Sequence, residues 1–85
     1  MSDIDYRLLR SVTARDLVRA LLRDGFEFRR RSGSHERYAH EDGRRVTVPY
    51  TRRGDTFAIG TLRSIIERQA RWTIDDLKRL ELLPS

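Results

Sequence analysis

The chain has 85 residues, enough for one compact domain and too few for two independent cores. It carries 18 Lys and Arg against 13 Asp and Glu, a formal net charge of +5, and every basic residue except Lys78 is arginine. Guanidinium groups bind phosphate in bidentate fashion, so the bias is consistent with a nucleic-acid partner or with a solvated arginine-rich surface. The absence of cysteine excludes disulfides and thiolate metal sites.

Residues 1–5 have neither a basic leader nor an apolar signal core, and no apolar run approaches membrane-spanning length. We therefore expect a cytoplasmic protein without membrane contact. Residues 1–11 show no clear period, and we expect Tyr6, Leu8 and Leu9 to fold back on the domain.

A helix is predicted to begin after Thr13, because Thr13 and Asp16 form a Thr-x-x-Asp capping box. Gly25 favours the left-handed conformation that commonly ends a helix. Between them, apolar residues recur at the spacing of an amphipathic helix: Ala14, Leu17, Val18, Leu21 and Leu22.

Three strands are predicted next, at residues 26–29, 35–40 and 45–48. The first alternates apolar and polar residues, as a half-buried strand does. Residues 32–34 are expected to form the first turn, and the Glu-Asp-Gly sequence at 41–43 is a strong hairpin signal. Pro49 ends the third strand because it cannot donate to the ladder.

After a polar loop at residues 50–58, an apolar stripe over 59–69 predicts a second long helix; its residues are Ile59, Leu62, Ile65 and Ile66. Thr73 and Asp76 repeat the capping box before a short last helix that carries Ile74, Leu77 and Leu80. The order is αβββαα, an α+β domain that occupies residues 1–85.

Strand alternation assigns the side chains of the sheet to two faces. If Phe26 and Phe28 face the helices and no bulge lies near Gly33, the open face collects Arg29, Arg31, His35, Arg37, Arg45 and Thr47. Like charges on neighbouring strands destabilise a sheet by about 0.2–1 kcal/mol per pair. The open face is therefore expected to bind an anion, unless local pairing with Glu27, Glu36 and Glu41 neutralises it.

His35 is the candidate for chemistry on that anion. The two histidines of the chain are not expected to form a metal site. His35 and His40 point to opposite faces of the predicted strand, and their spacing matches no metal-binding motif. Metal-free cleavage of RNA remains, in which the 2′-hydroxyl is the nucleophile and an imidazole moves its proton.

In that scheme Arg29, Arg31 and Arg37 would stabilise charge on the phosphorus, and Ser34 with the Gly33 amide would bind a phosphate oxygen. The second proton-transfer group is open; Tyr50 and His40 are candidates. The alternative is that His35 is a solvated polar residue and His40 a structural one. Phe26, Phe28 and Tyr38 are expected in the core, and Trp72 is expected to pack between the last two helices.

The chain resembles the HicA-type (YcfA-like) toxins of prokaryotic toxin–antitoxin modules. The resemblance extends from about Val12 to Leu80. It rests on four stretches in order: Leu-Leu-Arg-Asp-Gly-Phe at 21–26, Gly-Ser-His at 33–35, Asp-Gly-Arg-Arg-Val-Thr-Val-Pro at 42–49 and Gly-Thr-Leu-Arg-Ser-Ile-Ile at 60–66.

The resemblance implies a double-stranded-RNA-binding-like fold with helices on one face of a three-stranded antiparallel sheet. It implies a ribosome-independent mRNA endonuclease with His35 as the catalytic residue and no cofactor. It also implies a HicB-like antitoxin that binds the toxin and masks that histidine. The same basic face would also serve a non-catalytic RNA-binding module, or an inactive toxin relative retained for its protein partner.

Two departures from the family pattern concern the site and the last helix. Tyr50 stands where many relatives have histidine after Val-Pro, so a second acid/base residue there is in question. Arg71 and Trp72 follow Gln-Ala where many relatives have glycine, so the last helix is expected to leave at a different angle. Residues 1–11 precede the usual start of the family and are a candidate partner contact.

Overall fold

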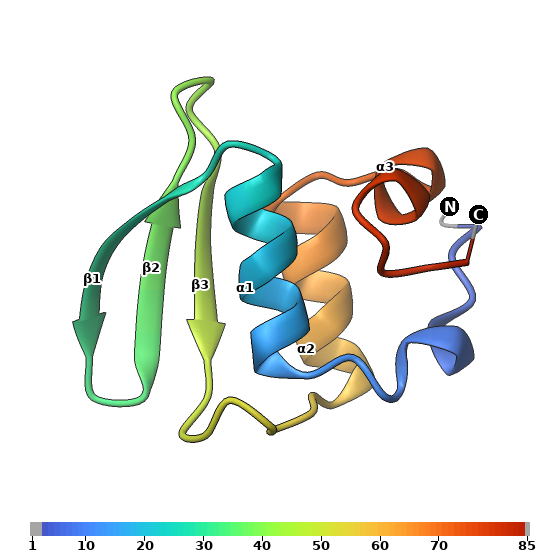
Figure 1. Ribbon diagram of the computed structural model, residues 1–85, viewed down its shortest axis with the longest axis horizontal. Coiled ribbons are helices and arrows are strands. Elements are labelled where there is room, and N and C mark those ends of the chain that lie inside the picture. The colour runs from blue at the N-terminus through green and yellow to red at the C-terminus, as the bar shows by residue number, and fades with distance from the viewer. Residues whose placement is uncertain (1–2, 85) are drawn as a thin grey trace.

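The computed structural model describes residues 3–84 and has helices on one face of a three-stranded antiparallel sheet (Figure 1). The order confirms the predicted αβββαα arrangement and the α+β class. In chain order the elements are η1 (Tyr6–Leu9), α1 (Ala14–Arg23), β1 (Glu27–Ser32), β2 (His35–Ala39), β3 (Arg45–Pro49), α2 (Ile59–Arg63), η2 (Ser64–Gln69) and α3 (Ile74–Arg79).

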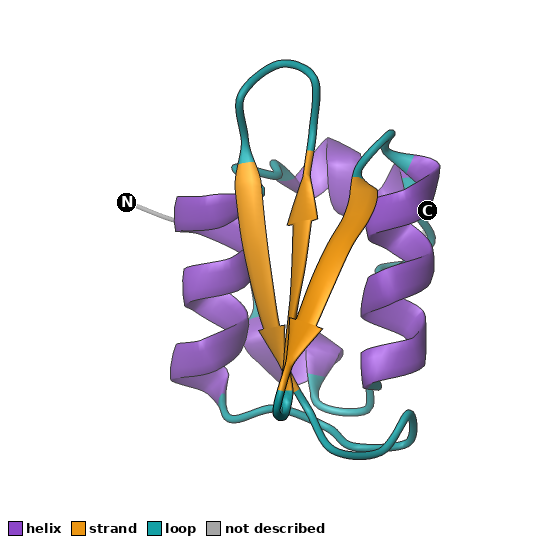
Figure 2. Ribbon diagram, turned by 90° about the vertical axis from the view of Figure 1, so that its left-hand side faces the viewer, coloured by secondary structure: helices purple, strands orange, loops and turns teal. Residues whose placement is uncertain are grey.

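The helices form a middle and an outer layer. The helices α1 and α2 lie against the sheet, and η1 and α3 lie on the far side of them (Figure 1). Turned to face the sheet, the molecule presents its strands in front with the helices behind (Figure 2). One face of the sheet is thus covered by helices, and the other is turned to solvent.

Both predicted capping boxes are formed. In the first, Asp16 donates its amide to Thr13 Oγ1 and its carboxylate accepts from the Thr13 amide; Thr73 and Asp76 repeat this pattern before α3. Gly25 follows the Asp24 cap of α1 with a φ of 97°, a conformation that side chains disfavour. The local chemistry of the helix ends therefore determines their boundaries.

The strands pair in the order β1-β2-β3. The turn between β1 and β2 is the two-residue Gly33-Ser34 link, with Gly33 at a φ of 58°; glycine at the first central position is typical of a type II′ hairpin turn. The register of β1 shifts between Phe28 and Arg30, so Arg29 is an extra residue in that strand. This bulge changes which arginines share a face.

The core lies between the sheet and the helices, and extends to the outer layer. Tyr6 and Leu9 of η1 are buried in it, as expected, whereas Leu8 is exposed. The other large core residues in the described range are Val12, Leu17, Leu21, Phe26, Tyr38, Val46, Val48, Leu62, Ile65, Ile66, Trp72, Leu77, Leu80, Leu82 and Leu83. Four expectations of burial were wrong: Leu8 is 58%, Leu22 53%, Phe28 51% and Ile59 44% exposed. Phe28 lies on the edge strand β1, and Ile59 is the first residue of α2.

The end of the second helix keeps a backbone shape that suits glycine. The η2 segment is a π-helical turn, which the bond from the Ala70 amide to the Ile65 carbonyl closes. Arg71 then adopts a φ of 56°, in the left-handed region that costs non-glycine residues about 1–2 kcal/mol. The chain thus holds at Arg71 the conformation that a glycine would take without strain.

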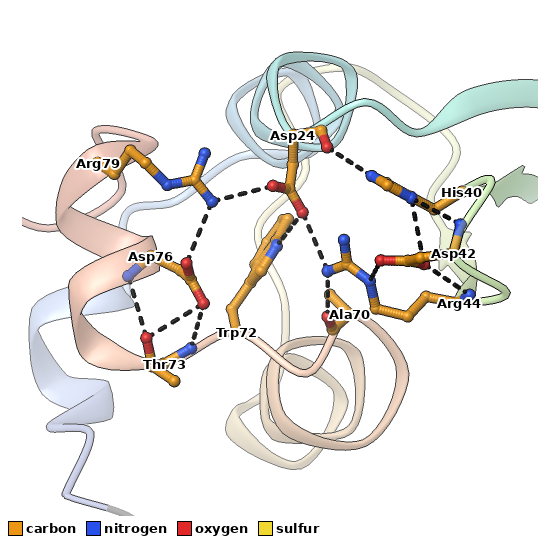
Figure 3. Close-up of polar contacts among 9 residues, drawn as sticks. All are labelled: Asp24, His40, Asp42, Arg44, Ala70, Trp72, Thr73, Asp76 and Arg79. Atoms are coloured by element: carbon orange, nitrogen blue, oxygen red, sulfur yellow. Dashed lines mark hydrogen bonds and ion pairs between the residues drawn. The ribbon is translucent and has the colours of Figure 1, made fainter.

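Asp24, the cap of α1, joins three other parts of the chain in what we call the Asp24 cluster (Figure 3). Its carboxylate accepts hydrogen bonds from Trp72 Nε1 (2.9 Å) and Arg79 Nη2 (2.9 Å), and Arg44 Nη1 lies 3.0 Å from it. Burial alone would raise the pKa of Asp24. The hydrogen bonds from Trp72 and Arg79 and the Arg44 charge outweigh burial and lower that pKa. The cluster ties α1 to the β2–β3 hairpin and to α3.

His40 belongs to the same end of the sheet. The Asp42 amide lies 3.1 Å from His40 Nδ1, and His40 Nε2 is hydrogen-bonded to the Asp24 carbonyl oxygen (2.8 Å). The Asp42 carboxylate also lies 3.1 Å from Nδ1, and the Phe26 ring stands edge-on at 5.1 Å. Both ring nitrogens have partners, which agrees with the structural role expected of His40.

Candidate nucleic-acid interface

His35 stands at the first position of β2, directly after the Gly33-Ser34 turn. It pairs across the ladders with Ser32 and Pro49, and its side chain is exposed. Tyr38 is buried in the same strand, so strand alternation directs His35 to the face away from the helices. The hydrogen bond from the Tyr50 amide to the Ser34 carbonyl (2.8 Å) secures this end of the sheet.

The next row on the open face is basic. Arg30 pairs with Arg37, and Arg37 pairs with Thr47 on β3. In the row beyond, Arg45 lies opposite Ala39, whose small side chain leaves space between the arginines. The result is a hollow of about 410 Å³, lined by Arg29, Arg30, Arg37, Tyr38, Ala39, Arg45, Val46 and Thr47. Arg29, Arg37 and Arg45 thus come together as predicted, and His35 lies at the end of the same face, in the row next to Arg37.

The predicted placement of Arg31 on the open face was wrong. The bulge at Arg29 shifts the alternation by one residue, so Arg31 pairs with Glu36 on the helix side and Arg30 takes the position on the open face. The sequence shows the run Arg-Arg-Arg at 29–31 but contains no feature that locates the bulge.

On the helix side, Arg31 and Glu36 form part of a closed polar group. Glu36 accepts hydrogen bonds from Tyr38 (2.8 Å), Tyr50 (2.7 Å) and Arg31 (3.0 Å), and the Arg31 guanidinium also lies over the Tyr50 ring. Burial would raise the pKa of Glu36, but the hydrogen bonds from Tyr50, Tyr38 and Arg31 lower it. Glu36 is therefore ionised and already partnered.

The alternative of local charge pairing holds for part of the sheet only. Glu36 neutralises Arg31 on the helix side, and Glu27 lies 3.8 Å from Arg29 in an exposed pair of little energetic value. Within residues 3–84, no ion pair involves the three remaining arginines of the open face: Arg30, Arg37 and Arg45. We call these three with His35 the open-face platform.

The two candidate second proton-transfer groups lie elsewhere. The Tyr50 hydroxyl donates to Glu36 on the helix side, and burial together with that bond raises the pKa of Tyr50. His40 is five residues along the chain from His35, about 16 Å at the rise of a strand. Neither residue can share one phosphate with His35 in this arrangement.

A family model described as HicA toxin of bacterial toxin–antitoxin matches residues 14–72. The match begins at the first residue of α1 and ends at Trp72, so it contains the open-face platform and most of the Asp24 cluster. The chain belongs to the HicA toxin family. None of the curated proteins compared with the chain matches it.

Membership makes this protein the toxin of a toxin–antitoxin pair, with a cognate antitoxin as its partner. The HicA match leaves out η1 and α3, which contribute Tyr6, Leu9 and Leu77 to the core. The predicted partner contact of residues 1–11 stays a prediction, and residues 1 and 2 lie outside the described part of the chain.

Metal-ligating side chains are dispersed over the molecule. Among residues 3–84, His, Asp and Glu side chains nowhere gather in a group of three or more that could hold a metal ion. Within the same range, each helix is too short or too polar to cross a bilayer.

Proposed function

We propose that this HicA toxin is an endoribonuclease that cleaves mRNA on the open-face platform, without a metal ion and without the ribosome. One observation carries the proposal: an exposed imidazole stands at the edge of a sheet face where Arg30, Arg37 and Arg45 have no ion-pair partner in the described chain. Phosphate groups of a transcript would relieve the repulsion between these cations.

The chemistry needs few protein groups because RNA supplies its own nucleophile. His35 accepts the proton of a 2′-hydroxyl, the resulting oxyanion attacks the adjacent phosphorus, and the bond to O5′ breaks. The leaving O5′ takes a proton from the imidazolium or from solvent. The products are a 2′,3′-cyclic phosphate and a 5′-hydroxyl.

The surrounding groups have electrostatic roles in this proposal. Arg37, one row from His35, stabilises the added negative charge on the phosphorus oxygens. The Gly33 amide and the Ser34 hydroxyl, both in the exposed turn, bind a phosphate oxygen. Arg29, Arg30 and Arg45 hold the flanking backbone. In this proposal Arg31 does not contact RNA, because its guanidinium is bound to Glu36 on the helix side of the sheet.

The proposal extends to the partner and the compartment. A HicB-like antitoxin would inhibit the toxin by masking His35, and the toxin would act in the cytoplasm, where its substrate is translated. A second candidate, a non-catalytic RNA-binding module, is favoured by the same unpaired arginines and by the absence of an assigned second proton-transfer group.

The test is incubation of purified protein with RNA in the presence of a chelator and without ribosomes, for the wild type and His35→Ala. We expect the variant to lose cleavage by about 10²–10⁴-fold while it still binds RNA, because imidazole moves the proton and the arginines hold the anion. Cleavage that is unchanged in His35→Ala would reject the assignment. Binding without any cleavage by the wild type would favour the second candidate.

A further inference from the structure

A second surface lies on the helix side of the sheet, where residues of α1 and β1 line one hollow. It is a hollow of about 270 Å³. Its walls come from Val18 and Leu22 of α1 and Phe28 of β1, and its floor is the Glu36, Tyr38 and Tyr50 group. We call it the α1–β1 groove.

The walls of the groove expose apolar side chains that the core does not use. Leu22 is 53% and Phe28 51% exposed, and these are two of the four large apolar side chains exposed in residues 3–84. The Phe28 ring stands edge-on to Tyr38 at 5.7 Å, so it is held in place rather than loose. Neighbouring exposed apolar groups of this kind indicate a contact surface.

The rim of the groove is positively charged. Arg15 and Arg53 line the groove itself, and Arg19 lines the adjoining hollow over α1. No ion pair in the described range involves any of these three guanidinium groups. Glu36 is the only carboxylate among the lining residues, and it already accepts hydrogen bonds from Arg31, Tyr38 and Tyr50. Within the described residues, the arginines of the rim therefore have no negatively charged partner.

The dimensions and chemistry favour a protein segment over other occupants. The groove is below the roughly 300–1,000 Å³ of typical small-molecule sites, and it is the right size for one or two side chains. A nucleic-acid backbone would meet the ionised Glu36 at the floor and gain little from Leu22 and Phe28. Apolar side chains would fit the walls, and neighbouring carboxylates would fit the arginine rim.

We propose that the α1–β1 groove docks a segment of the antitoxin that carries apolar side chains flanked by Asp or Glu. The groove lies on the side of β1 and β2 away from the open-face platform, so docking there is separate from contact with His35. The inference rests on the antitoxin partnership and does not require the nuclease chemistry. It gives the antitoxin an anchor that holds the toxin independently of the RNA-binding face.

The experiment measures the Kd of the purified cognate antitoxin for wild type, Leu22→Ser and Arg15→Glu. We expect each change to weaken binding about tenfold or more, because one removes a central apolar contact and the other reverses a rim charge. Arg15→Glu places an acid in the first turn of α1, where the helix dipole favours it, so it remains informative if Leu22→Ser folds poorly. RNA cleavage by the free toxin is expected to stay unchanged.

Ile59→Ser is the matched control, since Ile59 is 44% exposed but begins α2 and does not line the groove. Unchanged antitoxin affinity in both groove variants would overturn the proposal. So would a reduced RNA affinity with antitoxin affinity intact, which would assign the groove to RNA. If the wild type cleaves no RNA but the groove variants fail to bind the antitoxin, the docking site stands and the proposed nuclease fails.

Discussion

A histidine stands at each end of β2: His35 is its first residue, and His40 directly follows its last. The surroundings of the two differ in almost every respect. At the turn end, His35 is exposed beside arginines that have no ion pair within the described chain. At the other end, His40 is 15% exposed with partners on both ring nitrogens, next to a carboxylate that collects Trp72, Arg44 and Arg79.

We interpret the difference as a separation of stability from the proposed function along β2. Polar groups at the His40 end satisfy one another, so they can fix the hairpin and helices in place. Cations at the His35 end remain unsatisfied, which is unfavourable for the fold alone and suited to an anionic partner. The comparison can be tested by weakening each end separately.

The largest effect on stability is expected from Asp24→Ala. The change leaves the Arg44 guanidinium, 13% exposed, and the Trp72 indole N–H without their shared acceptor. We expect a decrease of about 3 kcal/mol in the free energy of unfolding, measured by urea denaturation. A decrease below about 0.5 kcal/mol would show that the Asp24 cluster does not hold this end together.

The same cluster predicts a pH dependence. Because folding lowers the pKa of Asp24 from its ordinary value of 3.8, its contribution is fully present above that value and is lost as pH falls through the folded pKa. The difference in unfolding free energy between wild type and Asp24→Asn should be constant from neutral pH to about pH 5 and shrink below about pH 4. A difference that grows on acidification would contradict the assignment.

At the other end, Arg30→Ser with Arg37→Ser should weaken RNA binding with little effect on stability. The salt dependence of binding should flatten by about 0.7 in the logarithmic slope for each phosphate of single-stranded RNA that the protein no longer neutralises. Arg68→Ser is the matched control, because Arg68 is exposed on η2, in the helical layer. An equal decrease per arginine in the control would mean that only total charge matters.

The smallest effect is expected from Arg71→Gly, beside the Asp24 cluster. Glycine relieves the strain of a φ of 56° but adds freedom to the unfolded chain, so we expect a net stabilisation of about 0.5–1 kcal/mol. Thermal unfolding measures it. Destabilisation would mean that the Arg71 side chain contributes interactions that offset its backbone strain.

Local rules predicted most of the fold. The capping boxes at Thr13 and Thr73, the glycine stop at Gly25 and the two hairpin turns all depend on neighbouring residues, and all were confirmed. The bulge at Arg29 was not predictable from the sequence. It depends on the pairing of β1 with β2, and the alternation of apolar and polar residues does not indicate it. Because of this bulge, Arg30 rather than Arg31 lies on the open face.

The partners of His40 and Asp24 were also beyond local reasoning. Asp24 lies 48 residues from Trp72 and 55 from Arg79, so only the packed fold brings them together. Strand alternation alone predicted the exposed position of His35. It was sufficient there because β2 and β3 pair without a register shift. Its catalytic role stays a prediction.

The most direct test of the division along β2 compares His35→Gln and His40→Gln for both RNA cleavage with chelator and unfolding free energy. We expect His35→Gln to abolish cleavage at near wild-type stability, and His40→Gln to lower stability by about 1–3 kcal/mol while the folded fraction still cleaves RNA. Undiminished cleavage by His35→Gln, or loss of cleavage by folded His40→Gln alone, would contradict it.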